Sequence, residues 1–435
     1  MMFQESKLLN KLLDIGRRIV PGRVFRLAQP IYHWKLAVLG ALIYGFPSRG
    51  MKVIAVTGTK GKSTTVFMIA KIFEDQGLPV AAVGSLGFKI GERTWPNNSK
   101  MTLPGRFKLQ KFLHQAKQSG AKFVVLEATS EGIVQYRLAG VKIDCAVYTN
   151  LHREHLESHG SFDNYMAAKQ KLFLKTKGIH VLNIDDPYFE KFANFSARHK
   201  ITYGREWGII SLANRQSPIA NLNLNLTGEF NEFNALAALA VAQAYGLDMD
   251  KAVESLNSIK SVPGRMEILE SKKGFKVVID YAHTPDSLEL VYQTLREQIA
   301  NRKSQIETDN KQFAISHKLI CVLGAAGGGR DKWKRPEFGK IAEQYCDEII
   351  LTDEDPYDEN PEEIIKQIAF GFQTPDSKLQ KILDRKEAIK AALSLATAGD
   401  TVVITGKGSE TSMAVAGGKK IQWSDKEIVM SLLTE

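Results

Sequence analysis

Residues 57–64, TGTKGKST, combine glycines with lysines and hydroxyl side chains, a set of residue types that suits a bound phosphate. They follow the apolar, strand-like run 52–58 and precede a segment whose apolar residues recur with helical spacing, which predicts a strand, a loop and a helix. Backbone N–H groups and the helix dipole would then face the phosphate, with Lys62 at its outer oxygens and Ser63 on Mg²⁺. Val56 stands where the general G-x-x-x-x-G-K-[ST] pattern has its first glycine, so the loop is a shorter variant. The residues expected around the nucleotide here are Gly58, Thr59, Lys60, Gly61, Lys62, Ser63 and Thr64.

One later residue, Glu127, has a side chain that could bind a metal ion on the sequence alone. Glu127 lies in the apolar run 122–129, at the strand end where an open α/β sheet places ligand-binding groups, so its carboxylate suits a metal. The alternative is an acid that caps a turn or helix. His155 stands between two other histidines, and Lys169 is one of several lysines on a predicted helix. Taken alone, these two would be ordinary solvated or core residues.

The elements that must position these residues alternate between strand and helix, which predicts an α/β fold with largely parallel sheets covered by helices. The pattern pauses near residue 262 and then restarts, and the polar segment 301–312 is predicted to be an exposed loop. We therefore expect a short helical segment at 1–48, a central P-loop ATPase domain at 49–262 and a Rossmann-like α/β domain at 263–435. The strands expected include 79–85, 122–129, 144–150, 275–282, 318–329, 347–354 and 400–408, with a long helix in 226–246.

Residues 1–48 are predicted to form two short amphipathic helices, interrupted near Pro21 and near Pro30, in place of a full domain. Their most apolar stretch, 36–46, is eleven residues long, well short of the roughly 20 that cross a bilayer. Core packing is the first interpretation of this stretch, and peripheral membrane contact is the alternative. Charged residues are mixed through the first thirty positions, so no secretory signal is expected.

Composition narrows the range of partners and the compartment. The formal net charge of +10 is spread along the chain without a nucleic-acid-binding signature, which favours anionic small molecules over nucleic acid. Cys145, Cys321 and Cys346 lie far apart in the sequence and form no CxxC pair, which argues against a disulfide framework or a cysteine-based zinc site. A reducing cytoplasm fits these cysteines best, and we also expect a monomer.

Six motifs, in order along the chain, are together similar to those of one enzyme family. From about residue 50 to the C-terminus the sequence resembles the Mur ligases, and within them the MurE type, the UDP-N-acetylmuramyl-tripeptide synthetases. The motifs are GTKGKST (58–64), LEATSEG (126–132), TNLHREHLESHGSFDNYMAAKQKLF (149–173), VPGRMEIL (262–269), DYAHTPDSLE (280–289) and GGGRDKWKRPEFG (327–339).

The resemblance implies roles for individual residues. His155 would ligate a second Mg²⁺, and Lys169 would be carbamylated, because an ammonium would repel the metal whereas a carbamate helps to hold it. The implied metal ligands are Ser63, Glu127, His155 and Lys169, and the implied catalytic residues are Lys62, His155 and Lys169. Further ATP contacts are implied for Asn231, Asn234, Arg265, Asp280, His283, Asp331 and Lys332. Acceptor contacts are implied for Thr102, Ser130, Gln135 and Arg137, and amino-acid contacts for Arg335, Asp355, Tyr357 and Glu410. Helix capping is the alternative for the asparagines, and surface ion pairs are the alternative for Lys332 and Arg335.

The activity implied is an ATP-dependent ligation of an amino acid to a UDP-MurNAc-dipeptide-like acceptor through an acyl phosphate, in peptidoglycan precursor synthesis. Two departures bear on the substrates. Only about fifty residues precede the phosphate loop, where the family has a UDP-binding domain. Asp355-Pro356-Tyr357 stands where diaminopimelate-adding relatives have D-N-P-R, and the acidic run 352–361 favours lysine or another diamino acid. The alternatives are a folylpolyglutamate-synthase-like ligase and a nucleotide-binding scaffold without catalysis.

Overall fold

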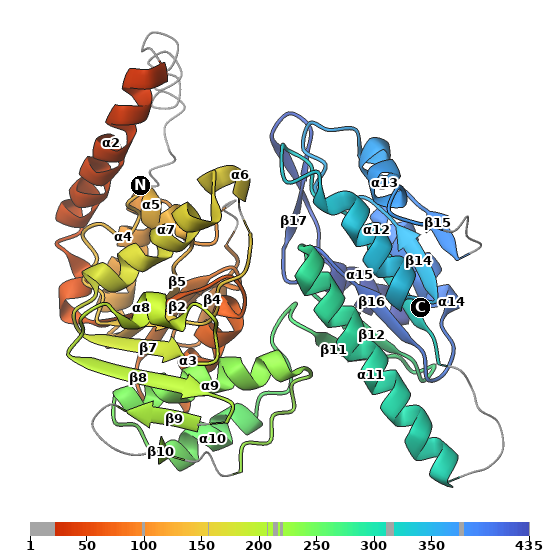
Figure 1. The fold of residues 1–435 in the computed structure, drawn as a ribbon, viewed down its shortest axis with the longest axis horizontal. Coiled ribbons are helices and arrows are strands. Elements are labelled where there is room, and N and C mark those ends of the chain that lie inside the picture. The colour runs from red at the N-terminus through yellow and green to blue at the C-terminus, as the bar shows by residue number, and fades with distance from the viewer. Residues whose placement is uncertain are drawn as a thin grey trace. The chain divides into compact units, whose positions relative to one another are not determined.

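The computed structural model describes residues 22–97, 101–154, 156–206, 208–211, 216–217, 221–309, 317–373 and 378–434. The chain forms two compact units, Met1–Pro218 with Leu236–Met249, and Ile219–Ala235 with Asp250–Glu435. Each unit has an α/β architecture around its own sheet, as the alternation in the sequence predicted (Figure 1).

A ten-stranded sheet runs through the first unit in the described part of the chain. Its strands are β1 (Lys52–Thr57), β2 (Val80–Gly84), β3 (Gly87–Ile90), β4 (Arg93–Trp95), β5 (Phe123–Glu127), β6 (Cys145–Tyr148), β7 (Ile179–Asn183), β8 (His199–Gly204), β9 (Gly208–Ser211) and β10 (Gln216–Ser217). The order across the sheet is β10-β9-β8-β7-β6-β1-β5-β2-β3-β4. The strands from β8 to β2 pair in parallel, and antiparallel strands extend both edges.

The central strands of this sheet are apolar and buried on both faces, as parallel strands covered by helices must be. The helices of this unit are α2 (Gly22–Ile43), α3 (Lys62–Asp75), α4 (Arg106–Gln118), α5 (Ser130–Val134), α6 (Leu156–His159), α7 (Phe162–Lys175) and α8 (Phe189–Ala193), with a 3-10 turn η1 at Pro47–Gly50. Helix α9 (Glu229–Ala244) spans the division between the units at residue 235. In the register, Val56 pairs with Glu127 and Thr57 with Tyr148, so the carboxyl ends of β1, β5 and β6 meet at one edge.

Helix α2 continues through Pro30, so the predicted interruption of the helix at that residue is wrong. Pro30 is exposed, so water can satisfy the carbonyl that a proline leaves without a helical donor. The other predicted break, at Pro21, lies outside the described residues. On the buried side of α2, small residues such as Ala37 and Ala41 pack closely against the unit.

The opposite side of α2 shows that core packing explains only part of its apolar stretch. Leu42 and Ile43 are each 62% exposed, and Lys35 is the sole charged residue from 29 to 43. We call this side the outer face of α2; it consists of Ile31, Tyr32, Trp34, Lys35, Val38, Leu39, Leu42 and Ile43.

The second unit contains a six-stranded sheet in the order β11-β12-β16-β13-β14-β15 and a two-stranded sheet β17-β18, in the part of it that is described. Its strands are β11 (Glu267–Glu270), β12 (Lys276–Ile279), β13 (Leu319–Leu323), β14 (Glu348–Leu351), β15 (Leu379–Lys381), β16 (Thr401–Ile404), β17 (Ser412–Val415) and β18 (Lys419–Gln422). Its helices are α10 (Met249–Asn257), α11 (Pro285–Asp309), α12 (Lys334–Tyr345), α13 (Pro361–Ala369), α14 (Arg385–Leu395) and α15 (Asp425–Thr434). All pairs in the larger sheet are parallel except β11 with β12.

The predicted loop at 301–312 is wrong as far as residue 309, because α11 continues through it. That stretch contains Arg, Lys, Gln and Glu, which are good helix formers, and neither Gly nor Pro, so its polarity does not end the helix. Residues 310–312 lie outside the described part of the chain.

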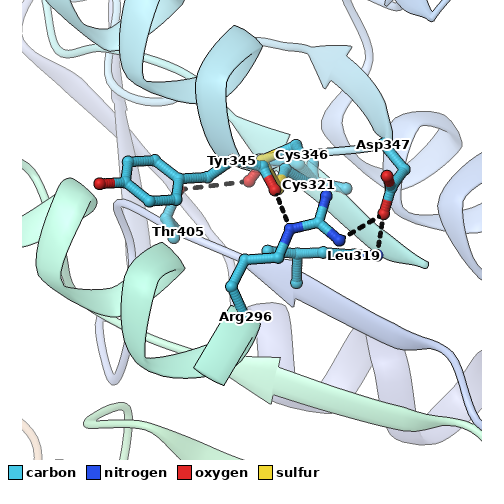
Figure 2. The surroundings of a disulfide bond; sticks show 8 residues. Arg296, Leu319, Cys321, Tyr345, Cys346, Asp347 and Thr405 are labelled. Atoms are coloured by element: carbon cyan, nitrogen blue, oxygen red, sulfur yellow. Dashed lines mark hydrogen bonds and ion pairs between the residues drawn. A yellow bond between two sulfur atoms is a disulfide. The ribbon is translucent and has the colours of Figure 1, made fainter. Parts of the chain in front are cut away.

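A disulfide joins Cys321 in β13 to Cys346 just after α12, which corrects the prediction of isolated cysteines (Figure 2). The two residues are separated by 25 positions, but β13 and β14 are parallel neighbours, and Cys346 lies just before β14. Around the bond, Arg296 forms an ion pair with Asp347 at 2.8 Å and donates to the backbone oxygen of Tyr345. Cys145 is buried as a free thiol. With two of the three cysteines paired, the cysteines no longer indicate a reducing compartment.

None of the helices in the described residues combines the length and the apolar character needed to cross a membrane.

Candidate active site

The phosphate loop between β1 and α3 depends on glycine at two positions. Gly58 has φ 151° and Gly61, the N-cap of α3, has φ 81°, both outside the range that other residues adopt easily. A Cβ on Gly58 would also lie 1.9 Å from the Thr149 hydroxyl oxygen. The loop is tied to the end of β6, because Lys60 N–H donates to the Asn150 side chain at 2.8 Å and Thr149 Oγ1 donates to the Lys60 carbonyl at 2.7 Å.

Two lysines from different helices meet at this loop. Lys62 Nζ donates to the carbonyl oxygens of Gly58 and Thr59 at 3.1 and 2.7 Å. Lys169 Nζ, on α7, donates to the same Gly58 oxygen at 2.6 Å and lies over the Tyr165 ring. Lys169 is 1% exposed, and burial, followed by the charge of Lys62, holds its pKa well below the usual value. A buried amine whose charged form is disfavoured thus stands beside the phosphate loop.

The predicted metal ligands Ser63 and Glu127 are joined through a third residue that the sequence analysis missed. The N–H and hydroxyl of Ser85 both donate to Glu127 Oε1 at 2.9 Å, so its oxygen accepts the 2.6 Å hydrogen bond from the Ser63 hydroxyl. Glu127 is 2% exposed. The available signal was the position of Ser85, directly after β2, whose carboxyl end lies at the same sheet edge as that of β5. These hard oxygen donors suit Mg²⁺, which prefers one or two carboxylates with hydroxyl and water oxygens.

The remaining predicted metal ligand, His155, lies outside the described residues. Among the residues that are described, no group of three or more His, Cys, Asp or Glu side chains is close enough to hold a metal. Of the four predicted metal ligands, the structure therefore describes Ser63, Glu127 and Lys169 at this edge.

The predicted acceptor residues follow along the same edge. Ser130 is buried at the start of α5 and hydrogen-bonds the His159 ring at 3.0 Å, which gives a place in the site to a histidine that the sequence left as ordinary. Arg137 donates to the Gln135 side chain at 2.7 Å, and the carbonyl of Thr102 accepts from Asn97 at 3.2 Å.

In the second unit, three of the predicted amino-acid ligands gather around a lysine that the sequence analysis did not select. Lys407 is fully buried, and its Nζ pairs with Asp355 at 2.9 Å and with Glu410. Tyr357 lies nearby with φ 54°, and its N–H donates to the Ala414 carbonyl while Ala414 N–H donates to Asp355. The signal for Lys407 was its place in the glycine-flanked turn after β16.

Arg335 does not join that cluster directly. It is 1% exposed, and its guanidinium donates to Glu359 at 3.0 Å, to Gln367 at 2.6 Å and to the Ala326 carbonyl at 3.1 Å. Its charge is already paired with the Glu359 carboxylate, which favours the ion-pair alternative for this residue. Lys332 and Asp331, predicted near ATP, form ion pairs with Glu359 and with Lys334.

The other nucleotide residues predicted in the second unit are mostly buried. Asp280 accepts from the N–H groups of Met266 and Ala282, each at 2.7 Å, so its carboxylate holds the turn that contains Arg265. Arg265 lies over the ring of Tyr281, which also contacts His283. Asn231 and Asn234 are buried on α9 and hydrogen-bond each other at 3.2 Å.

Comparison with known proteins decides the family. The model of the Mur ligase middle domain matches residues 56–242, and that of the Mur ligase glutamate ligase domain matches 264–408. A UDP-N-acetylmuramyl-tripeptide synthetase of Roseiflexus sp. (strain RS-1) is 34% identical over 97% of this chain and 85% of its own length. The chain belongs to the Mur ligase family. It is therefore an ATP-dependent peptide ligase, and a role as a scaffold without catalysis is set aside.

Other relatives of this Mur ligase agree. A UDP-N-acetylmuramoyl-L-alanyl-D-glutamate–2,6-diaminopimelate ligase of Clostridium acetobutylicum is 35% identical over 92% of this chain and 82% of its own. A solved structure of a ligase with that activity has TM-score 0.55 at 31% identity, covering 88% of this chain and 78% of the other. A folylpolyglutamate synthase of Mycobacterium tuberculosis has TM-score 0.65 at 18% identity, covering 86% and 92%, and shares the fold alone.

Proposed function

We propose that this Mur ligase adds lysine or another diamino acid to a UDP-MurNAc-dipeptide-like acceptor, through an acyl phosphate, in peptidoglycan precursor synthesis. The observation that carries the proposal is the edge of the first sheet. There Lys62 and Lys169 share the Gly58 carbonyl and Ser63, Ser85 and Glu127 form one hydrogen-bonded chain. Phosphoryl transfer needs little from a protein beyond such positioning and neutralisation of charge.

A carboxylate is a poor electrophile, so the acceptor carboxylate first takes the γ-phosphoryl group of ATP, releasing ADP. The amine nitrogen then attacks the acyl carbon, phosphate leaves and the amine loses a proton, which yields the amide. In this scheme Lys62 exchanges its two carbonyl contacts for phosphate oxygens, and the loop N–H groups hold the nucleotide. Mg²⁺, when bound, would neutralise the phosphate charge at Ser63 and Glu127.

Carbamylation of Lys169 is supported by the burial of its amine, which disfavours the ammonium form. In its neutral form Nζ can attack CO₂, form the N–C bond and release a proton, which leaves an anionic carbamate at the phosphate loop. The charge of Lys62 at the shared Gly58 carbonyl would then attract this group rather than repel it. His155 stays a proposed ligand from the family resemblance alone.

The substrate assignment rests on the two clusters of side chains. Thr102, Ser130, Gln135 and Arg137 are proposed to bind the acceptor in the first unit. In the second, Asp355, Tyr357 and Glu410 are proposed to bind the incoming amino acid, with Lys407 holding the two acids in place. Asp355 and Glu410 share one cation, Lys407, so the two acids favour a cationic side chain on the incoming amino acid. Asn231, Asn234, Arg265, Asp280, His283, Asp331 and Lys332 are proposed to assist ATP binding.

The test is phosphate release from ATP with UDP-MurNAc-L-Ala-D-Glu, screened over the amino acids. Lysine or another diamino acid should stimulate release. Lys62→Ala and Lys169→Ala should each reduce it by at least about 10²-fold, because each removes a group that helps to neutralise the phosphate charge, directly or by holding Mg²⁺. Lys171→Ala, on the same helix as Lys169, is the matched control and should keep full activity. Turnover only with a folate acceptor and glutamate would sink the assignment.

We also propose that the outer face of α2 contacts an anionic membrane surface. Its apolar side chains are uncovered, and residues 1–50 contain eight Lys and Arg against two acidic residues, a charge that complements anionic lipid. Because ATP and free amino acids are cytoplasmic metabolites, we place the protein on the cytoplasmic side of that surface, and we propose that it works there as a monomer.

A further inference from the structure

Two arginines of the first unit meet on one glutamine. Arg106, the first residue of α4, donates from Nε and Nη2 to the backbone oxygen of Gln135 at 3.2 and 2.9 Å. Arg137 donates from Nε and Nη2 to Oε1 of the same glutamine at 3.2 and 2.7 Å, and from Nη1 to the Leu103 carbonyl at 2.7 Å. Both guanidinium groups are thus held in place by neutral oxygens.

Neither arginine forms an ion pair with any described residue, although Arg137 is buried. Burial lowers the pKa of Arg137, the neighbouring charge of Arg106 lowers it further, and Glu131 offsets part of this. Burial also lowers the pKa of Arg106. Two adjacent cations that only Glu131 partly offsets are costly where water is partly excluded, and an anion between them would lower that cost.

Helix α2 brings a third group to the same place. A Cβ on Gly40 would lie 3.4 Å from Phe107 and 3.6 Å from Gln110, and the Tyr44 ring lies 5.5 Å from that of His114. Later residues of α2 therefore face later residues of α4, and the earlier residue His33 lies toward the helix start at Arg106.

His33 has a ring nitrogen that could bind an anion. Its Nδ1 is buried and has no hydrogen-bond partner. Burial, and then the charges of Arg106 and Arg137, lower its pKa to about 4, so both arginines are close enough to act on it. The start of α4 adds to the positive potential, because its first turn contains no acid and Gly105 offers no side-chain cap.

We propose that His33, Arg106 and Arg137 form a subsite for an oxyanion group of the acceptor, either a phosphate of its diphosphate or its free carboxylate. The inference rests on the proposed function, because it assigns part of the muramyl acceptor to these residues. It gives α2 a role in substrate binding, which no motif in the sequence suggested for that segment. Guanidinium groups bind both kinds of oxyanion through paired N–H donors.

The test compares Arg106→Gln and His33→Gln with Lys111→Gln, an exposed cation on the same helix. Arg106→Gln should raise the acceptor KM about tenfold, worth about 1.4 kcal/mol, with kcat and the ATP KM changed less than about twofold. His33→Gln should act in the same direction, and Lys111→Gln should change nothing.

Two trimmed acceptors identify the source of the anion: MurNAc-dipeptide without UDP, and UDP-MurNAc-dipeptide with its free α-carboxylate amidated. The acceptor that lacks the bound anion should show the same KM with the wild type and with Arg106→Gln. The proposal is overturned if Arg106→Gln weakens both trimmed acceptors as much as the complete one, or if it weakens none of them.

A binding measurement separates this subsite from the proposed function. With ADP filling the phosphate loop, inorganic pyrophosphate should raise the unfolding temperature of the wild type and of Lys111→Gln, but less that of Arg106→Gln. Without pyrophosphate, Arg106→Gln should be no less stable than the wild type, because it removes one of two repelling charges. Equal pyrophosphate effects in all three proteins would refute the subsite, whereas absence of turnover with muramyl acceptors would refute only the function.

Discussion

At the scale of single residues, the candidate site at the edge of the first sheet depends on ionisable groups that are buried. Burial and the neighbouring charge of Lys62 lower the pKa of Lys169, and Glu127 is held by Ser85. The sequence shows each residue type, but its protonation follows from neighbours that are far apart along the chain.

Glu354, next to the predicted amino-acid ligand Asp355, gives a pH-dependent prediction of the same kind. It is 5% exposed, and burial raises its pKa from 4.5 to about 7, with Arg385 opposing this and Asp355 adding to it. The folded state therefore holds a proton that the unfolded state releases from about pH 4.5 upward, so the free energy of unfolding should fall as pH rises to about 7. The loss should reach up to about 3 kcal/mol.

Glu354→Gln removes this titration. Its free energy of unfolding in urea should therefore exceed that of the wild type at pH 8 and should depend less on pH between 5 and 7. Glu387→Gln, an exposed residue of the same unit, serves as the control and should follow the wild type. A wild-type stability that rises across this pH range would contradict the prediction.

At the scale of elements, α2 has two faces with different tasks. The face with Ala37, Gly40 and Ala41 packs closely on the unit, and the outer face of α2 leaves its large apolar side chains uncovered. Few monomeric proteins keep such a continuous apolar stripe exposed without a binding role.

If the outer face of α2 binds membranes, the protein should sediment with vesicles that contain anionic lipid, and the double variant Leu42→Ser with Ile43→Ser should bind them more weakly. Burial of each side chain in lipid contributes about 2 kcal/mol at most, so the double variant should lower the partition coefficient at least about tenfold. Leu290→Ser on α11, where the leucine is 38% exposed, is the matched control. Concentration-dependent dimerisation through this face without lipid, or no binding to anionic vesicles, would contradict the proposal.

At the scale of the whole molecule, the disulfide bears on both stability and compartment. Cys321–Cys346 closes a loop of 25 positions in the second unit, which should contribute about 3 kcal/mol to its stability by restricting the unfolded chain. Protein isolated with thiols blocked at lysis should show one free thiol after denaturation, from Cys145. Reductant should then lower the free energy of unfolding, and Cys321→Ala with Cys346→Ala should be insensitive to it. Three free thiols would mean that the pair is reduced in the cell.

The sequence by itself determined the α/β class, the phosphate loop and the family, because these depend on local properties. Apolar periodicity marks strands and helices, and a loop of fixed length places Gly58, Lys62 and Ser63 within a few residues of one another. The same local reasoning failed at Pro30 and at 301–309, where helices continue because exposed backbone and good helix formers tolerate what the pattern treats as a break.

Only the tertiary structure decided which distant residues meet. Ser85 joined Ser63 to Glu127, Lys407 joined Asp355 to Glu410, and Cys321 joined Cys346, because parallel strands bring together residues that many positions separate. The structure also shows that Arg335 is buried and bonded to Glu359, and that α2 places His33 toward Arg106. Packing and burial create these relations, and neither is encoded at any single position of the chain.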